Sequence, residues 1–386
     1  YPRSFSLLPD CIFLFGPLMP VLHLVLVSGF ALYILFTIFF ITGLLRLKKH
    51  PKAEDPFPKV SVVAAARNEE DSLPALLDDL SRQDYPQDKI SFVIADDRSE
   101  DKTWDIIQEK AQDDNRFVGV KIEELRKDMT PKKYALTCAI QETESEIILS
   151  TDADCRVPDG WAKSMVNALS SGSGIAVGLS TVSIKENSFF SKYQFIDFLG
   201  IMAANAGALG WGTGWSGSGQ NLGYTRKQFE KIDGFTPVGD LLSGDDMYLV
   251  QSISSRAKAV FNLDSAGFAT TLPAANVSSF LSQRIRWASN AKPSLMSRPV
   301  FFIFLLSAFL ANAGVFAGLF FDYAMHLVPL VFGTKVVFEA GVMFTGAARF
   351  GMKIPILPFL CWSVLQPIYI PVVGLFGLIG KFRWKS

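Results

Sequence analysis

The charged residues of this chain of 386 residues are concentrated in its middle, and both of its ends are apolar. Between residues 4 and 45 the only Asp, Glu, Lys or Arg is Asp10. Between residues 299 and 348 only three such side chains occur, Asp322, Lys335 and Glu339. Long stretches with so little charge are typical of membrane-spanning segments. The sequence therefore predicts a polar domain held between two membrane-embedded ends.

The 37 basic and 37 acidic residues give a formal net charge of zero. Because a protein that binds nucleic acid presents a basic surface, this balance argues against a nucleic-acid partner. Hydrophobic residues make up 49% of the chain, which argues against disorder and against an ordinary soluble enzyme. The composition favours a protein that has the membrane as a partner.

Residues 21–45 contain no charged side chain and are long enough to cross a hydrocarbon core of about 30 Å as a helix. We expect a transmembrane anchor there, preceded by an apolar, proline-broken segment over residues 1–20 at the membrane interface. Positive charge beside a span marks its cytoplasmic side. We therefore expect an integral protein of a bacterial inner membrane, with residues 46–298 in the cytoplasm. The basic residues that carry this inference follow the anchor: Arg46, Lys48, Lys49 and Lys52.

The other apolar end, residues 299–380, holds three candidate spans. Residues 299–320 form a good one. Residues 325–347 contain Lys335 and Glu339, which are four positions apart and can pair on one face of a helix. Residues 354–380 contain four prolines. Three crossings would place the basic tail, residues 381–386, on the outer side, against the positive-inside tendency. Two or three crossings are therefore both open.

The polar domain alternates between short apolar runs and amphipathic segments. The runs at residues 60–66, 90–95, 118–122 and 146–150 predict β-strands, and the segments between them predict helices. This alternation indicates a parallel α/β sheet with ligands at the carboxyl ends of the strands. Residues 212–217 match the dinucleotide pattern G-x-G-x-x-G, but they do not follow a first strand. We interpret residues 207–223 as a flexible, close-packed loop beside a substrate.

Two pairs of acids fall at the ends of predicted strands: Asp96 with Asp97, and Asp152 with Asp154. Carboxylates at positions i and i+2 beyond a strand can chelate one hard divalent cation. Mg²⁺ or Mn²⁺ is suited to neutralise a nucleotide diphosphate there. Either pair alone is also typical of a solvated turn that caps a helix. Because both pairs occur at strand ends, we favour a nucleotide site.

Two further motifs precede the C-terminal apolar end. Asp245 and Asp246 stand before an amphipathic segment, where adjacent buried carboxylates raise each other's pKa, so that one can act as a general base. A helix cap is an equal alternative. In the run QRIRW, Arg286 can hold phosphate oxygens, and Trp287 offers a flat apolar face to a sugar or lipid. A basic-aromatic membrane anchor is the alternative interpretation of this run.

Taken together, these residues resemble the membrane-bound inverting glycosyltransferases of family 2, which include ceramide glucosyltransferases and processive β-glycan synthases. The resemblance covers roughly residues 60–292 and implies a GT-A (Rossmann-like) α/β domain between N- and C-terminal transmembrane helices. One departure is Asp245, where the family more often has Glu. The motifs occur in the family's order: AAARNEE, DDRSEDKT, KKYAL, TDADC, SGSGQNLGYTRKQFEKIDGF, GDD and QRIRW, the last a full match to Q-x-x-R-W.

The resemblance also implies a role for each motif. Asp154, assisted by Asp152, would bind Mg²⁺ or Mn²⁺. Asp246 would be the catalytic base, with Asp245 beside it. Gln283, Arg286 and Trp287 would hold the diphosphate and form the floor of the acceptor site. The nucleotide sugar, expected to be a UDP-sugar, would be bound by Arg67, Glu69, Asp96, Asp97, Lys132 and Asp152.

Three functions remain open for the acceptor side. We favour transfer of one sugar, with inversion, to a membrane-embedded alcohol such as a diacylglycerol, ceramide, polyprenol or carotenoid. The first alternative is a processive synthase that exports a β-linked polysaccharide, with a partner subunit or as a homo-oligomer. The second is a non-catalytic membrane assembly subunit, against which the retained motifs weigh. Aromatic residues at positions 189, 190, 193, 195 and 198 indicate an interfacial helix able to admit a lipid, with a plain core helix as the alternative.

Overall fold

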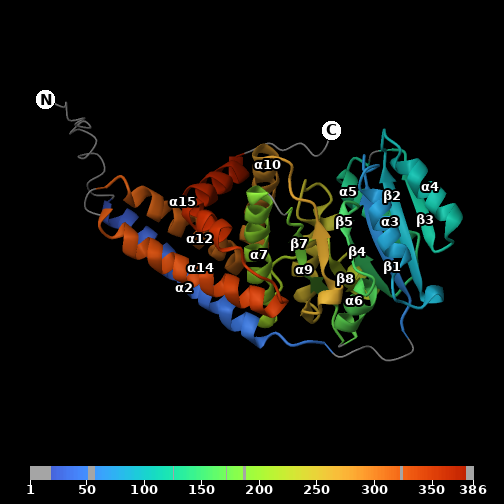
Figure 1. Ribbon diagram of the computed structural model, residues 1–386, viewed down its shortest axis with the longest axis horizontal. Coiled ribbons are helices and arrows are strands. Elements are labelled where there is room, and N and C mark those ends of the chain that lie inside the picture. Colours follow the sequence, from blue (N-terminus) through green and yellow to red (C-terminus); the bar gives the residue numbers. More distant parts are fainter. Residues whose placement is uncertain are drawn as a thin grey trace.

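The computed structural model describes residues 19–50, 57–124, 126–170, 172–185, 188–321 and 325–379. The molecule is elongated, with long helices gathered at one end and an α/β domain at the other (Figure 1). Helix α7 (Phe189–Gly210) stands between the two parts. Most of the predicted interfacial segment, residues 1–18, and the basic tail at 381–386 lie outside the described residues.

The α/β domain is built on a sheet of seven strands in the order β3-β2-β1-β4-β8-β6-β9. Neighbouring strands are parallel except β8, which runs antiparallel to both β4 and β6. A smaller sheet has the order β5-β10-β7. The strands are β1 (Val60–Ala66), β2 (Ile90–Asp97), β3 (Phe117–Ile122), β4 (Ile147–Ser150), β5 (Cys155–Arg156), β6 (Ile175–Gly178), β7 (Ser180–Val182), β8 (Leu222–Thr225), β9 (Ala259–Asn262) and β10 (Ala269–Thr271).

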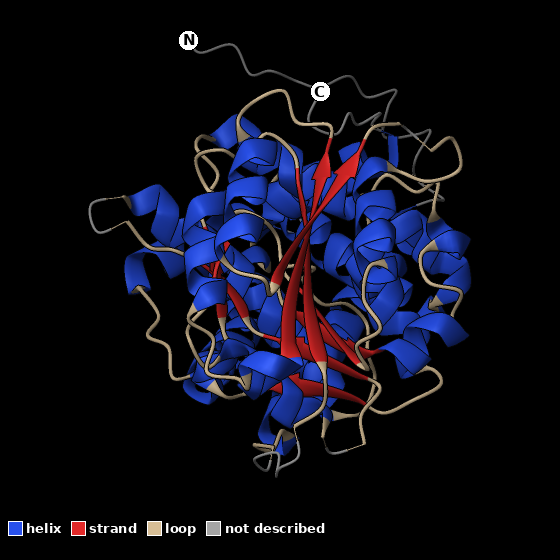
Figure 2. Cartoon of the chain, turned by 90° about the vertical axis from the view of Figure 1, so that its right-hand side faces the viewer, coloured by secondary structure: helices blue, strands red, loops and turns tan. Residues whose placement is uncertain are grey.

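Helices cover both faces of the large sheet (Figure 2), so each face has its own hydrophobic core. Successive residues of β1 show this, because Val62 packs into one core and Val63 into the other, and neither is exposed. Burial on both faces explains why every residue of the strand except Ser61 is apolar. The first core includes α3 (Leu73–Ser81), α4 (Thr103–Asp113) and α6 (Trp161–Leu169), and the second includes α5 (Pro131–Gln141), α7, α8 (Arg226–Lys231) and α9 (Asp245–Ser254).

The predicted α/β fold with a parallel core is confirmed. The first strand has the bounds expected from its apolar run, and the next three strands begin or end within two residues of the expected positions. Short 3-10 helices add detail that the pattern does not reveal: η1 (Gln87–Lys89), η2 (Thr236–Val238) and η3 (Ser265–Gly267).

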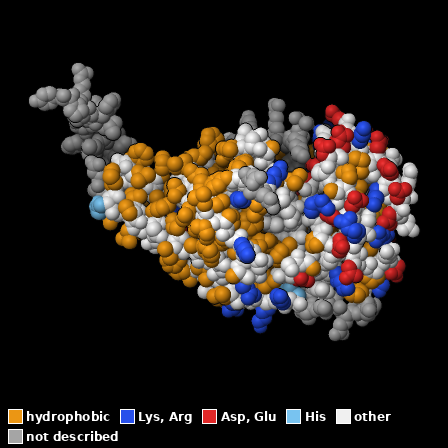
Figure 3. Space-filling model, in the orientation of Figure 1, with side chains coloured by type: hydrophobic (Ala, Val, Ile, Leu, Met, Phe, Trp, Pro, Cys, Tyr) orange, Lys and Arg blue, Asp and Glu red, His pale blue; other side chains and the backbone are white. Residues whose placement is uncertain are grey.

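Four helices are long and apolar enough to cross a membrane. They are α2 (Met19–Arg46), α12 (Pro299–Gly318), α14 (Val328–Phe350) and α15 (Ile356–Ile379). Hydrophobic side chains cover this end of the molecule, whereas charged side chains gather on the α/β domain (Figure 3). Helix α15 continues through Pro367 and Pro371. The predicted pair on α14 is confirmed, with 2.8 Å between Lys335 Nζ and Glu339 Oε1.

Two amphipathic helices lie between the domain and the long helices in sequence: α10 (Val277–Ala288) and α11 (Ala291–Ser297). Helix α10 packs against α15, where Tyr369 stacks on Phe280 with 6.0 Å between ring centroids. The second core of the sheet continues through these contacts into the helical end. The two ends of the molecule are therefore joined by one apolar interior.

The tightest joint is the crossing of α2 and α7. A β-carbon on Gly43 would overlap the carbonyl of Gly207, and one on Gly210 would overlap the carbonyl of Gly43. Small residues let two helices approach to backbone contact. The expected loop over residues 207–223 is therefore wrong at both of its ends, because α7 continues to Gly210 and β8 begins at Leu222. Gly207 and Gly210, which suggested a loop, serve helix packing instead.

The aromatic run that indicated an interfacial helix lies at the start of α7. Phe189 is exposed, but Tyr193, Phe195 and Phe198 are buried among the sheet and the long helices. The burial of these three side chains agrees with the alternative interpretation of the run, a plain core helix. Only Phe198 of this run lines the cavity described below.

The glycine crossing predicts the effect of a single methyl group. Gly43→Ala should destabilise the protein by about 1–3 kcal/mol, because the added carbon meets backbone atoms that have no side-chain freedom to move. Thermal unfolding in detergent should show the loss as a lower midpoint. Gly333→Ala is the matched control, since a β-carbon at Gly333 on α14 meets no atom within 4 Å. An unchanged midpoint for Gly43→Ala would contradict the close crossing.

Candidate active site

One cavity of about 820 Å³ lies between the carboxyl ends of the parallel strands and the interior of the long helices. Every site residue expected from the sequence lines it, with the exception of Asp96. The same cavity is lined by side chains of α2, α12, α14 and α15. Most of its charged residues lie at the domain end, and most of its apolar residues lie at the bundle end.

The outer part of the site is made by the turns that follow β1 and β2. Asn68 and Arg98 take left-handed backbone conformations there, with φ of 53° and 54°. The turns are tied together, because Asn68 Oδ1 accepts a hydrogen bond from the Glu100 amide at 2.9 Å. Non-glycine residues in this region are uncommon and cluster at functional sites. The strain fixes the direction in which both turns leave the sheet.

These turns place three of the expected nucleotide residues on the cavity wall: Arg67, Glu69 and Asp97. Asp97 pairs with Arg98 at 2.6 Å and lies 3.8 Å from Arg67. Asp96 is buried behind them, and burial raises the pKa of its carboxyl. Asp96 Oδ1 and Arg67 Nε have no hydrogen-bond partner among the described residues. Buried polar atoms without partners are costly, so a ligand with its own donors and acceptors suits this end.

The centre of the site is organised around the Lys132 ammonium, at the start of α5. Its Nζ lies 2.7 Å from Asp152 Oδ1 and 3.8 Å from Asp245 Oδ2. Burial alone lowers the pKa of Lys132, but the carboxylates of Asp152 and Asp245 outweigh it and raise the pKa. One positive charge thus holds together the acids that follow β4 and those that begin α9.

Asp245 and Asp246 lie in the first turn of α9. This position agrees with both interpretations of the pair, a helix cap and a general base. Asp246 accepts hydrogen bonds from the amides of Met247 at 2.7 Å and Gly219 at 3.1 Å. Burial and the charge of Asp245 raise the pKa of Asp246 to about 6. Burial also raises the pKa of Asp245, but the charges of Lys132, Lys133 and Arg286 together outweigh burial and leave this pKa below its usual value. The pKa values of the two neighbouring acids therefore differ, and Asp246 is the one suited to take up a proton.

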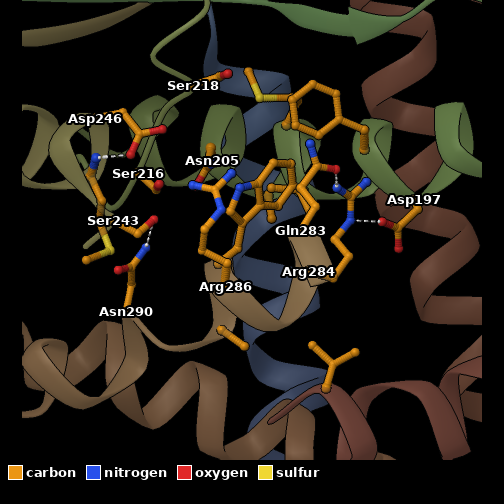
Figure 4. A pocket seen from close by; sticks show the side chains of 18 of the residues that line it. Asp197, Asn205, Ser216, Ser218, Ser243, Asp246, Gln283, Arg284, Arg286 and Asn290 are labelled. Carbon is orange, nitrogen blue, oxygen red and sulfur yellow. Dashed lines mark hydrogen bonds and ion pairs between the residues drawn. The ribbon is translucent and has the colours of Figure 1, made fainter. Parts of the chain in front are cut away.

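The turn before this helix depends on Gly244, which has φ of 88°. A β-carbon there would lie 3.0 Å from Asn290 Oδ1, and Asn290 Nδ2 donates to Ser243 Oγ at 3.3 Å. Figure 4 shows this contact on one side of Asp246. Any other residue at position 244 would be strained both in its backbone and against Asn290.

Helix α10 brings Gln283, Arg286 and Trp287 to the cavity. Arg286 and Gln283 are seen beside each other in Figure 4, across the cavity from Asp246. Burial lowers the pKa of Arg286, although Asp245 and Asp246 oppose this effect, and the guanidinium keeps its charge. Trp287 packs on Phe198 of α7 with 5.6 Å between ring centroids.

Sequence reasoning missed Arg284, the variable position inside the Q-x-x-R-W run. Its Nε donates to Asp197 Oδ2 at 2.6 Å, and its Nη1 donates to Gln283 Oε1 at 2.5 Å (Figure 4). The guanidinium lies 4.2 Å from the ring centroid of Trp287. Asp197 also accepts from Trp362 Nε1 on α15 at 3.1 Å. Arg284 therefore orients Gln283 and Trp287 and links α7, α10 and α15. The signal available in the sequence was Asp197, an acid inside the aromatic run of residues 189–198.

The contact with Arg284 also decides the orientation of the Gln283 amide. A guanidinium donates only, so the amide oxygen of Gln283 faces Arg284. The NH₂ group of Gln283 is left as the donor on the cavity side. Two side chains of α10 are thus available to an anionic ligand: the Gln283 amide as a hydrogen-bond donor and the Arg286 guanidinium as a cation.

The acids suit a divalent cation without forming a protein cage. Among the described residues, no group of three or more His, Cys, Asp or Glu side chains is arranged to hold a metal. Mg²⁺ is commonly bound by one or two carboxylates together with substrate phosphates. Asp152 and Asp154 both line the cavity beside the donors of α10. The residues present fit a cation that arrives with a diphosphate.

Comparison with known proteins shows what the domain is similar to. Residues 61–233 match the family model Glycosyl transferase family 2. This stretch includes the strand ends and the D-x-D acids but ends before α9. The mixed α/β architecture is GT-A-like. The domain and the relatives described next support a transferase enzyme.

Beta-monoglucosyldiacylglycerol synthase of Synechocystis is 30% identical over 112 residues, which are 29% of this chain and 23% of that one. The protein of the same description from Trichormus variabilis is 35% identical over 103 residues, 26% and 21% of the two chains. The chain therefore spans less than a quarter of the length of these curated relatives. The mannosyltransferase PcManGT from Pyrobaculum calidifontis, solved with GDP-Man and Mn²⁺, has a TM-score of 0.61, 20% identity and coverage of 94% and 100%.

The buried Asp197–Arg284 pair predicts a large loss of stability when one partner is removed. Arg284→Met leaves the Asp197 carboxylate buried without its cation, which should cost about 3–5 kcal/mol. The exposed pair of Arg126 and Asp128 is the control, since solvent screens this pair and Arg126→Met should leave the unfolding midpoint almost unchanged. Thermal unfolding in detergent compares the two variants. Equal small losses would mean that the pair does not hold α7 to α10.

Proposed function

We propose that this protein transfers a single sugar from a nucleotide sugar to the hydroxyl group of a lipid, with inversion at the anomeric carbon. The observation that carries the proposal is that one cavity serves both parts of the molecule. It is lined at one end by Asp246 and the acids after β4, and at the other end by four helices able to span a membrane. A donor and a lipid can therefore meet without either leaving its own environment.

The domain end supports a nucleotide sugar as the donor. Arg67, Glu69 and Asp97 on the cavity wall offer charged and hydrogen-bonding atoms to a nucleoside. Lys132, Gln283 and Arg286 offer cations and donors to a diphosphate. We take the donor to be a UDP-sugar. When bound, Mg²⁺ or Mn²⁺ on Asp154, assisted by Asp152, would neutralise the departing diphosphate. Lys132, Gln283 and Arg286 contact the phosphates and stabilise the same negative charge.

Asp246 removes the proton from the acceptor hydroxyl. Its carboxylate is held by the amides of Gly219 and Met247, so it points to one place without a change of side-chain conformation. A pKa near 6 leaves it mostly ionised at neutral pH while keeping it a better base than a free carboxylate. The acceptor oxygen then attacks the anomeric carbon from the face opposite the diphosphate, which inverts that centre.

The bundle end supports a lipid as the acceptor. Its cavity wall is made mostly of apolar side chains, among them Phe302, Phe309, Val342 and Ile370. A polysaccharide or a soluble sugar carries hydroxyl groups around every ring, so it matches this wall less well than a lipid chain does. The relatives described as glucosyldiacylglycerol synthases are consistent with a lipid. We infer that Trp287, stacked between Arg284 and Phe198, supports the acceptor where the two environments meet.

The position of the domain on the membrane follows from the charges at the end of α2. Arg46, Lys48 and Lys49 are exposed where the chain leaves the helix, and Arg46 lies 4.1 Å from the ring centroid of Trp211. Basic and aromatic residues together are typical of the cytoplasmic interface. We propose that the catalytic domain faces the cytoplasm, where nucleotide sugars are made available.

Radiolabelled UDP-sugars and membranes containing the protein test this function. Label that moves into the organic extract, and that chromatographs as one glycosylated lipid, is the expected result. Label that remains as an insoluble polymer would identify a polysaccharide synthase instead. Absence of transfer with every donor, in the presence of Mn²⁺, would favour a non-catalytic subunit. GDP-mannose is included because a similar structure holds GDP-Man.

The role of Asp246 predicts a separation of binding from turnover. Asp246→Asn keeps the shape of the side chain but cannot accept the proton, so turnover should fall about 100- to 10,000-fold. The affinity for UDP with Mn²⁺, measured by calorimetry, should change less than threefold, about 0.7 kcal/mol. Asp264→Asn, at an exposed loop position, is the control for both measurements. Turnover retained in Asp246→Asn would remove this residue as the base.

The raised pKa of Asp246 also predicts the acidic limb of the pH profile. A base works only when ionised, so activity requires a pH above its pKa. The value of kcat/KM should therefore fall as the pH drops through about 6, with about a tenfold loss for each pH unit below it. A limb centred near pH 4 would show that burial and Asp245 do not act on Asp246 as described.

A further inference from the structure

The bundle end of the cavity contains a small number of polar side chains that the proposed transfer does not use. Tyr33 on α2 donates to Glu339 Oε1 on α14 at 2.6 Å, and Glu339 is also paired with Lys335. Lys335 and Glu339 are buried, and Tyr33 and Glu339 line the cavity. Charged groups among membrane helices are expensive, and their retention points to a function.

Asn312 on α12 lines the same cavity and is 1% exposed. Its Nδ2 donates to the carbonyl of Ala308 at 2.9 Å, which fixes the orientation of the amide. Its Oδ1 has no hydrogen-bond partner among the described residues. An amide oxygen left without a partner in an apolar wall lowers stability unless a ligand supplies a donor. The group that Asn312 lacks is therefore a hydroxyl or an N–H.

Asn312 lies far from the reacting hydroxyl. The start of α12 is beside the catalytic helix α9, because the Arg298 guanidinium donates to the Gln251 carbonyl and Ser294 Oγ lies 3.8 Å from Met247 Sδ. Asn312 is about 20 Å farther along α12 than Pro299, at 1.5 Å per residue.

The neighbouring helix places the polar pair at the same inner end. Helices α2 and α12 run antiparallel, since Gly29 packs on Leu310 and Gly314 packs on Leu26. Tyr33 is about one helical turn from Gly29, so Tyr33, Glu339 and Asn312 belong to the inner part of the cavity. This part offers the Asn312 oxygen and the Glu339 carboxylate, which are acceptors.

We propose that this inner part is a second polar subsite, which binds a hydrogen-bond donor on the far portion of the acceptor. The acceptor is then a long, mostly apolar alcohol with a second hydroxyl about 20 Å from the one that is glycosylated. A lipid whose polar groups all adjoin the reacting hydroxyl would leave Asn312 and Glu339 facing hydrocarbon. The inference rests on the proposed transfer to a lipid and narrows its acceptor class.

Two acceptors of equal length test the subsite: cetyl alcohol, with one terminal hydroxyl, and the α,ω-diol of the same chain. The full-length protein in lipid nanodiscs is given the labelled donor, Mn²⁺ and each alcohol in turn. The native protein should use the diol about three- to tenfold better by kcat/KM, the factor that one net hydrogen bond contributes. Rates are compared per hydroxyl group, because the diol has two equivalent ends. On that basis Asn312→Leu should reduce the ratio of diol to mono-alcohol to about one.

Ser307→Ala is the matched control. Ser307 is also a buried polar residue of α12, but its hydroxyl donates to the Phe304 carbonyl and does not line the cavity, so the diol ratio should be kept. A native protein without preference for the diol, or a preference retained in Asn312→Leu, would overturn the subsite. The same nanodiscs are also given an extract of native membrane lipids. Label absent from that extract would overturn the lipid function itself, and with it the subsite.

Discussion

The backbone contact between α2 and α7 is the constraint on which the rest of the structure depends. Gly43, Gly207 and Gly210 let a helix able to span a membrane lie directly on the helix that covers the sheet. This contact extends the core of the α/β domain into the bundle. Because α2 packs directly on α7, the carboxyl ends of the strands and the long helices line the same space. Donor chemistry and a lipid path can then share one cavity.

Inside that cavity, the surrounding charges give side chains of the same type different pKa values and different roles. Lys132 stabilises the charge of Asp245, whereas Asp246 is left with burial and a negative neighbour, and its pKa rises. On the opposite wall, Arg284 is neutralised by Asp197 and works through Gln283 and Trp287. The charged residues that face the substrate are thus different from the pair, Arg284 and Asp197, that holds the helices together.

The sequence predicted the parallel sheet, because short apolar runs alternate with amphipathic segments, and the runs of β2 and β4 are followed by pairs of acids. It also predicted which residues meet at the strand ends, since that follows from topology alone. It could not predict the burial of Asp96 away from the cavity wall, or the part played by Arg284, because both depend on packing between distant segments. The glycines at 207 and 210 were interpreted as loop residues. A glycine needed for close helix packing and one needed for a turn look the same in a sequence.

The central claim is that donor and acceptor meet in one cavity that enters the bundle. Cross-linking with a photoactivatable long-chain alcohol, mapped by mass spectrometry, tests it most directly. We expect adducts on Phe309 and Ile370, which line the cavity, and their loss when excess unlabelled acceptor is added. Val364, on the same helix as Ile370, is 61% exposed on the outside and serves as the reference for surrounding lipid. Adducts confined to Val364 and similar outward positions would contradict an acceptor path through the bundle.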